Sequence, residues 1–141
     1  MNILEKITAH KKIEVAEQKR QITTRQLECS RYFEPPRYSM KEYLLNPEKS
    51  GIIAEFKRHS PSQGDINIDA DVLTVTSGYI KAGASGLSIL TENKFFKGRN
   101  EDLTNARNFN EAPILRKDFI VDEYQIVEAR SIGADVILLI A

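Results

Sequence analysis

An acidic and a basic residue stand two positions apart in the apolar segment 51–58, at Glu55 and Lys57. In a strand, alternation places these two side chains on one face, and the turn-forming residues 60–64 place them near its carboxyl end. Parallel α/β folds keep their catalytic groups at that end of the sheet. The pair is therefore a candidate for a functional role, but for an isolated pair with this spacing a simple salt bridge at the strand end is the favoured interpretation.

A second apolar segment, 113–119, also ends in charge, and alternation puts Lys117 and Phe119 on one face of it. Two ammonium groups are thus expected at the ends of two strands. Lys117 could instead pair with Asp118, but adjacent strand residues face opposite sides of a sheet. This geometry favours a functional role for Lys117.

The elements that must position these groups alternate between strand and helix. Four apolar segments indicate strands, and segments with helical spacing separate them. Gly83 and Gly133 each end a helix directly before a strand, so the chain repeats one unit. This order implies a parallel sheet with right-handed crossovers. The strands are expected near residues 52–58, 86–91, 113–118 and 135–140.

The expected fold class is α/β, as the first four units of a (β/α)8 TIM barrel. The sequence has no G-x-G-x-x-G and no Walker motif, so the doubly wound nucleotide folds lose their usual support. A complete barrel needs about 250 residues, whereas the chain has 141. We therefore interpret it as truncated, with Ala141 in or just after strand four of eight. The expected domains are an N-terminal helical extension, 1–48, and half of a barrel, 49–141.

Alternation also predicts which strand residues face each side of the sheet. The barrel interior or its mouth should receive Ile53, Glu55, Lys57, Ser88, Leu90, Leu115, Lys117, Val136, Leu138 and Ile140. The helices should cover Ile52, Phe56, Leu87, Ile89, Ile137 and Leu139.

The N-terminal extension is expected to be helical. Ser39 and Glu42 have the spacing of a capping box, which predicts a short helix through Leu45. Before it, apolar residues among charged ones indicate an amphipathic helix or helix pair. Its apolar stripe is expected to contain Ile3, Leu4, Ile7, Ile13 and Val15.

Composition excludes several function classes. Twenty basic and twenty acidic residues leave no net charge, and no basic stripe with interleaved aromatic residues is present, so nucleic acid is not an expected partner. The first residues lack the continuous apolar core of a signal peptide or membrane anchor, so no membrane partner is expected. Cys29 is the only cysteine, and no Cys/His spacing suggests a metal. We expect a cytoplasmic protein without a metal or another cofactor.

Three segments in a fixed order identify a family. They are EFKRHSPSQG at 55–64, GLSILTENKFFKG at 86–98 and LRKDFIVDEYQI at 115–126. With them the chain resembles the indole-3-glycerol-phosphate synthase family, the ring-closing decarboxylases of tryptophan biosynthesis. The resemblance extends over the whole chain and covers the N-terminal half of the family's pattern.

The resemblance implies a role for each residue singled out above. Lys117 would be the general acid that protonates the substrate's ketone oxygen during ring closure. Lys57 would bind the anionic substrate and assist dehydration, and Glu55 would orient Lys57. Ser60 and Pro61 would border the anthranilate or the sugar phosphate.

Apolar walls for the aromatic ring are implied in the same way. Phe96, Phe119 and Leu138 would enclose the ring and exclude water. Without the resemblance, Phe96 and Phe119 would be interpreted as core residues, because aromatic side chains at strand ends usually pack.

The family also implies groups that this sequence does not contain. They are a glutamate on strand five, an asparagine on strand six, and phosphate-binding loops after strands seven and eight. The phosphorylated substrate, 1-(2-carboxyphenylamino)-1-deoxyribulose 5-phosphate, should therefore not be turned over by this chain alone. Its open half-barrel is expected to self-associate, as a two-fold dimer.

Two alternatives belong to other classes. One is another sugar-phosphate barrel, such as an aldolase with a Schiff-base lysine. The other is a non-catalytic half-barrel that acts as a self-associated assembly.

Overall fold

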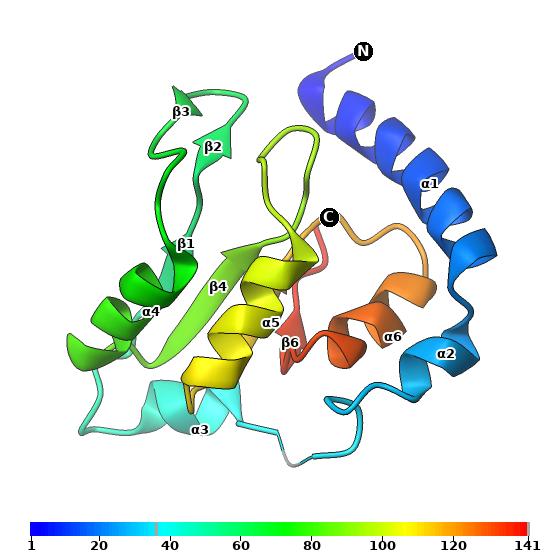
Figure 1. Cartoon of the computed structure of the whole chain (residues 1–141). Coiled ribbons are helices and arrows are strands. Elements are labelled where there is room, and N and C mark those ends of the chain that lie inside the picture. Colours follow the sequence, from blue (N-terminus) through cyan, green and yellow to red (C-terminus); the bar gives the residue numbers. More distant parts are fainter. Residues whose placement is uncertain (36, 141) are drawn as a thin grey trace.

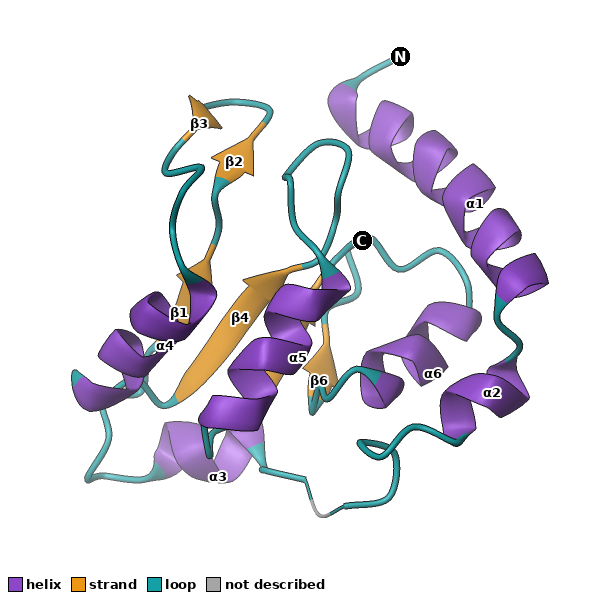
Figure 2. Ribbon diagram, viewed as in Figure 1, coloured by secondary structure: helices purple, strands orange, loops and turns teal. Residues whose placement is uncertain are grey.

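The computed structural model describes residues 1–35 and 37–140, and the expectation for Ala141 lies outside this range. Four parallel strands form the central sheet in the order β1, β4, β5, β6, so neighbours in space are also successive in the βα repeat (Figures 1 and 2). This is the α/β arrangement expected for part of a TIM barrel. The strands are β1, Ile53–Phe56; β4, Gly86–Leu90; β5, Ile114–Lys117; and β6, Val136–Ile137.

One helix follows each of the first three strands of this sheet, and all three helices pack against the sheet, the last of them against β6. Gly83 and Gly133 have φ angles of +101° and +108°, the left-handed backbone that ends a helix and favours glycine. The predicted repeat is therefore confirmed at both C-caps. The helices are α4, Val72–Lys81; α5, Asn100–Phe109; and α6, Tyr124–Ser131.

The core lies between these helices and one face of the sheet. Phe56, Leu87 and Ile89 are buried there, as predicted, and Ile137 packs against the same cluster. The prediction was wrong for Ile52 and Leu139, which are 60% and 69% exposed. Both residues lie outside the observed strand ends, where alternation no longer decides which way a side chain points.

A small antiparallel hairpin interrupts the connection between β1 and α4. It consists of β2, His59–Ser60, and β3, Gly64–Asp65, where the sequence had predicted only a turn. Gly64 has a φ of +67°, which a hairpin turn accepts most readily from glycine. The hairpin rises beyond the carboxyl end of β1 (Figure 1).

Three helices precede the sheet: α1, Ile3–Gln21; α2, Thr24–Glu28; and α3, Met40–Leu45. The hydroxyl of Ser39 accepts a hydrogen bond from the Glu42 backbone N–H at 3.2 Å, so α3 begins as predicted. Helix α1 runs beside the loops at the carboxyl ends of the strands, and α2 lies against α6 (Figure 1). None of the helices in the described range combines the length and apolar character that a membrane span requires.

The predicted apolar stripe of α1 was only partly right. Ile7 and Val15 are buried, whereas Ile13 is 72% exposed and Ile3 and Leu4 are also exposed. Residues 7, 11 and 15 are four apart and share one helix face, so the third buried residue is a lysine, Lys11.

Candidate active site

The carboxylate of Glu55 lies between the two predicted lysines. Its Oε2 atom is 3.2 Å from Nζ of Lys117, and its Oε1 atom is 3.9 Å from Nζ of Lys57. The hydroxyl of Ser88 donates a hydrogen bond to Oε2 at 2.9 Å. All three charged side chains are about one-third exposed, so the cluster is open to a ligand.

Strand register explains this cluster. Glu55 of β1 is paired with Ser88 of β4, and Lys117 of β5 is paired with Leu90, two residues further along β4. Residues two apart in a strand share a face, so Glu55, Ser88 and Lys117 project from the same side of the sheet. The two lysines were predicted to share a face, and both lie near the same carboxylate, that of Glu55.

The competing pair between Lys117 and Asp118 does not form. Asp118 is 2% exposed and lies on the opposite side, where its Oδ1 atom is 3.2 Å from Nζ of Lys11. Its Oδ2 atom accepts a hydrogen bond from the hydroxyl of Thr91 at 2.6 Å. Lys117 is therefore left with Glu55 as its acidic partner among the described residues.

Two aromatic side chains from separate loops lie against each other. The ring centroids of Phe96 and Phe119 are 5.9 Å apart, with the ring planes tilted by 36°. Both side chains are half-buried. Phe96 comes from the loop after β4, and Phe119 follows β5 directly.

The remaining predicted residues lie at the edges of this region. Ser60 is buried in the hairpin, where its hydroxyl accepts a hydrogen bond from the Gln63 backbone N–H at 3.2 Å. Pro61 is exposed at the hairpin turn, and Leu138 is half-buried just beyond β6.

Charged contacts tie the hairpin to the loop after β4. Asp65 of β3 accepts a hydrogen bond from the ammonium group of Lys97 at 2.8 Å. It accepts a second one from His59 at 2.8 Å when the imidazole carries a proton on Nδ1. These hydrogen bonds, from Lys97 first and His59 second, lower the pKa of the Asp65 carboxyl. Behind the hairpin, the guanidinium of Arg58 binds both oxygens of Asp102 at 2.6 and 3.2 Å.

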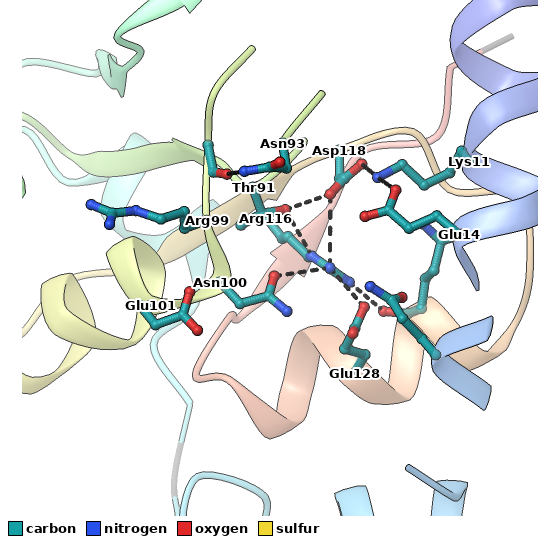
Figure 3. A pocket seen from close by; sticks show the side chains of 13 residues that line it. Lys11, Glu14, Thr91, Asn93, Arg99, Asn100, Glu101, Arg116, Asp118 and Glu128 are labelled. Atoms are coloured by element: carbon teal, nitrogen blue, oxygen red, sulfur yellow. Dashed lines mark hydrogen bonds and ion pairs between the residues drawn. The ribbon is translucent and has the colours of Figure 1, made fainter. Parts of the chain in front are cut away.

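A separate polar cavity of about 180 Å³ is lined by residues of α1, the loops after β4 and β5, and α6 (Figure 3). Arg116 points into its centre and binds Glu128 at 2.7 Å and Asn100 at 3.2 Å. The cavity is also lined by Lys11 and Asp118, whereas the Glu55 cluster lies outside it. The residues that line this cavity bind one another, and such mutual binding is typical of a structural network rather than of a ligand site.

One cluster in the described part of the chain has the composition of a metal site. Ligand atoms of His10, Glu14 and Glu92 lie within 4.8 Å of one another. The ammonium of Lys11 is 2.8 Å from Glu14 and 3.8 Å from Glu92, so it already supplies positive charge to both carboxylates. We interpret these carboxylates as counter-ions of Lys11 rather than as metal ligands.

Two polar residues with close contacts in this region, Ser88 and Lys11, were given no role from the sequence. Ser88 was placed on the correct face but was given no role, although its position opposite Glu55 follows from the strand register. Lys11 was not singled out, although it interrupts an apolar stripe at a spacing of four residues.

The arrangement suits acid catalysis on an anionic, aromatic substrate. Two ammonium groups can bind anions or donate protons, and a shared carboxylate fixes their positions. The aromatic pair in the loops after β4 and β5 offers a surface on which a flat ring can stack.

Comparison with known proteins places the chain in a family. A family model described as indole-3-glycerol phosphate synthase matches residues 4–141. The indole-3-glycerol phosphate synthase of Bacteroides thetaiotaomicron is 49% identical over 140 residues, which cover 99% of this chain and 54% of that protein. The enzyme of that name from Bacillus pumilus is 48% identical over 127 residues, covering 89% of this chain and 50% of that protein.

A longer relative extends the comparison to fungi. The multifunctional tryptophan biosynthesis protein of Schizosaccharomyces pombe is 45% identical over 148 residues, covering 99% of this chain and 19% of that protein. The chain spans about half the length of the indole-3-glycerol phosphate synthases it matches.

Proposed function

The chain belongs to the indole-3-glycerol phosphate synthase family, and we propose that it supplies the ring-closing half of such an enzyme's active site. The reaction is the closure of 1-(2-carboxyphenylamino)-1-deoxyribulose 5-phosphate with loss of carbon dioxide and water, a carboxy-lyase step of tryptophan biosynthesis. The name of the fungal relative supports the pathway.

The observation that carries this proposal is the single carboxylate between two lysines. Glu55 holds Lys117 at 3.2 Å and lies 3.9 Å from Lys57. Ring closure needs a proton donor for the ketone oxygen and a polar anchor for an anionic substrate, and two ammonium groups can meet these two needs.

Each group then has a defined task. Lys117 donates its proton to the ketone oxygen while the aromatic carbon that bears the carboxylate attacks the ketone carbon. Carbon dioxide leaves from that aromatic carbon. The new hydroxyl group then takes up a proton and leaves as water, while the neighbouring CH2 carbon loses a proton to form the double bond of the indole ring. Lys57 binds the substrate anion and assists the loss of water, and Glu55 keeps both ammonium groups in position.

The substrate ring is assigned to the apolar side of the cluster. Phe96 and Phe119 form the walls against which the ring lies, and Leu138 extends this surface beyond β6. Ser60 and Pro61 border the substrate from the hairpin. Water is excluded best when the ring fills this space, which strengthens the electrostatic effect of the lysines.

The test uses the complete protein that carries this chain, with the substrate named above. Formation of the indole product and release of carbon dioxide at equal rates would support the proposal. Treatment with borohydride should trap no adduct. A covalent adduct on Lys57 or Lys117 would instead indicate a Schiff-base aldolase.

We also propose that this chain alone self-associates and does not turn over the substrate. In the described range, β1 and β6 are the edges of the sheet, and Ile53, Ile126 and Ile140 are each at least 39% exposed. In a two-fold dimer these edges would pair with a second copy and the exposed apolar side chains would be buried, and both changes favour association. Light scattering at micromolar concentration should show a dimer, and a compact monomer would contradict this.

The free, exposed thiol of Cys29 fits a reducing compartment, which supports the cytoplasm as the place of action.

A further inference from the structure

A buried lysine outside the proposed site, Lys11, contacts three carboxylates. Its side chain is 4% exposed, although burial of an ammonium group is costly unless its charge is compensated. Nζ lies 2.8 Å from Glu14, 3.2 Å from Asp118 and 3.8 Å from Glu92. Helix α1 thereby reaches the loops at the carboxyl ends of β4 and β5.

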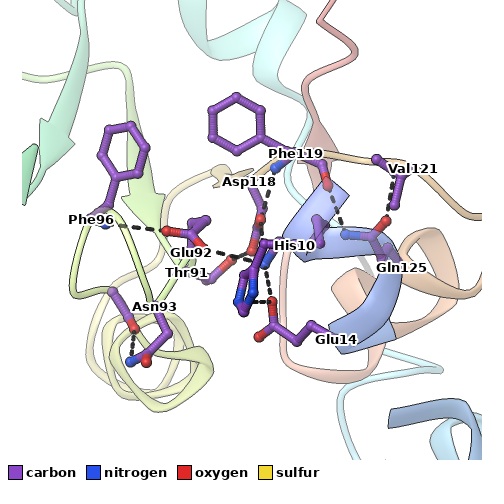
Figure 4. Close-up of polar contacts among 12 residues, drawn as sticks. His10, Glu14, Thr91, Glu92, Asn93, Phe96, Asp118, Phe119, Val121 and Gln125 are labelled. Atoms are coloured by element: carbon purple, nitrogen blue, oxygen red, sulfur yellow. Dashed lines mark hydrogen bonds and ion pairs between the residues drawn. The ribbon is translucent and has the colours of Figure 1, made fainter. Parts of the chain in front are cut away.

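Glu92 and Asp118 each hold the backbone of a loop that carries an aromatic wall (Figure 4). Oε2 of Glu92 accepts hydrogen bonds from the backbone N–H groups of Phe95 at 2.7 Å and Phe96 at 3.1 Å. Oδ1 of Asp118 accepts one from the backbone N–H of Phe119 at 2.7 Å. The same lysine thus contacts the two carboxylates that fix these two loops.

Among the described residues, Glu92 forms its ion pair with Lys11. Glu92 is fully buried, and its Oε1 atom has no hydrogen-bond partner there, so the ammonium of Lys11 at 3.8 Å compensates its charge. Asp118 has a second cation, Arg116, at 3.7 Å. Loss of Lys11 would leave a buried carboxylate uncompensated, which strongly favours rearrangement of the loop that contains it.

We propose that Lys11 is a positioning residue for the two aromatic walls of the proposed site. Its ammonium group, carried by α1, holds the carboxylates of Glu92 and Asp118, and these carboxylates hold the backbone beneath the walls. The inference rests on the proposed function, because the walls are assigned to the substrate ring there. The rings of His10 and Phe95 form a T-shaped pair with their centroids 6.0 Å apart, which is a second contact of α1 with the same loop.

The first test does not depend on activity. Amide hydrogen exchange of this chain should be compared between Lys11→Met and the matched control Lys12→Met, whose lysine is the exposed neighbour on α1. Lys11→Met should speed exchange at Phe95, Phe96 and Phe119 by about tenfold or more, with little change in α4. Equal exchange in the two variants at those amides would overturn the proposal.

A second variant keeps the test decisive if Lys11→Met unfolds. Glu92→Gln keeps an oxygen that can accept the Phe95 and Phe96 N–H groups but removes the charge that Lys11 compensates. In the Glu92→Gln background, Lys11→Met should fold and should change exchange at Phe95 and Phe96 less than about threefold. The same large effect in both backgrounds would mean that Lys11 does not act through Glu92, and would overturn the proposal.

The link to the substrate is tested in the complete protein. Lys11→Met should raise KM by about tenfold and change kcat less, because walls that hold a ring stabilise the bound substrate and the transition state alike. A KM within twofold of Lys12→Met, despite faster exchange, would overturn the role in substrate binding. If the unaltered complete protein did not turn over the substrate, the proposed function would fail, while exchange would still decide whether Lys11 holds the aromatic residues.

Discussion

At the scale of residues, the two lysines of the site differ in how firmly they are held. Lys117 lies within hydrogen-bond distance of Glu55, at 3.2 Å, whereas Lys57 lies 3.9 Å away. A side chain that is held less firmly is freer to reach a ligand. From the sequence, Glu55 was expected to orient Lys57, because these two residues are close in the chain. The shorter contact of Glu55 with Lys117 was not predicted, because Lys117 is far away in the chain.

This difference predicts separate effects on the kinetics. Lys57→Met in the complete protein should raise KM by roughly 10- to 100-fold and also lower kcat, since a hydrogen bond to a charged group is worth about 1.5–3 kcal/mol. Steady-state kinetics with the phosphorylated substrate measure both constants. A KM within about twofold of the unaltered protein would remove Lys57 from substrate binding.

Lys11 gives the folded chain a dependence on alkaline pH. Burial lowers the pKa of Lys11, but the nearby carboxylates of Asp118, Glu14 and Glu92 outweigh this effect and raise the pKa above its ordinary value. The folded state then binds this proton more tightly than the unfolded chain does. The resulting stability is present below the ordinary lysine pKa of about 10.4 and is lost as pH rises through the folded pKa.

The expected result is a fall in the urea midpoint of unfolding as pH rises above about 10. Tyr124 acts in the same direction, because burial and the charge of Glu128 raise its pKa. Lys11→Met should therefore make the fall shallower without abolishing it, and Lys12→Met should leave it unchanged. Identical pH profiles for Lys11→Met and the unaltered chain would contradict this account.

At the scale of elements, period-2 and period-3.6 patterns predicted the four strands of the central sheet and the helices between them. These elements bury one face in a shared core, so the pattern of apolar residues reports their structure directly. The hairpin of β2 and β3 has no such face, and only short-range turn residues mark it. It could not be distinguished from a simple turn.

Contacts between segments that are distant in the chain could not be predicted from the sequence. Lys11 and Asp118 are 107 positions apart, and no local pattern connects them. Glu55 and Lys117 were placed on one face by alternation, but the distance between them depends on the strand register. The part of the site within single strands was therefore predictable, and the ion pairs that connect strands, loops and α1 were not.

Gly98 closes the loop that carries Phe96, and it has no room for a side chain. A Cβ atom at this position would lie 2.3 Å from the carbonyl oxygen of Leu90. Gly98→Ala should destabilise the chain by about 1–3 kcal/mol, because the loop must move away from β4. Gly78→Ala is the matched control, since nothing lies within 4 Å of its added Cβ in α4, and it should stabilise by about 0.5–1 kcal/mol.

Urea denaturation of both variants measures this difference. A Gly98→Ala midpoint equal to or above that of Gly78→Ala would show that the loop after β4 is not held against the strand.

At the scale of the whole molecule, the described residues form one side of a site. The side chains of Glu55, Lys57 and Lys117 are each about one-third exposed, and the ring centroids of Phe96 and Phe119, in the loops after β4 and β5, lie 5.9 Å apart. The carboxyl ends of the strands, the hairpin and α1 all meet at this end of the molecule (Figure 1). The proposed site therefore lies at this end of the molecule.

The most direct measurement is the turnover of Lys117→Met in the complete protein. Lys81, exposed at the end of α4, provides the control variant Lys81→Met. Loss of a general acid lowers the rate by about 10²- to 10⁴-fold, or roughly 3–5 kcal/mol, so kcat should fall by that factor while KM changes by less than roughly threefold. The control should retain full activity. Turnover above about half of the control in Lys117→Met would contradict the assignment of Lys117 as the acid of ring closure.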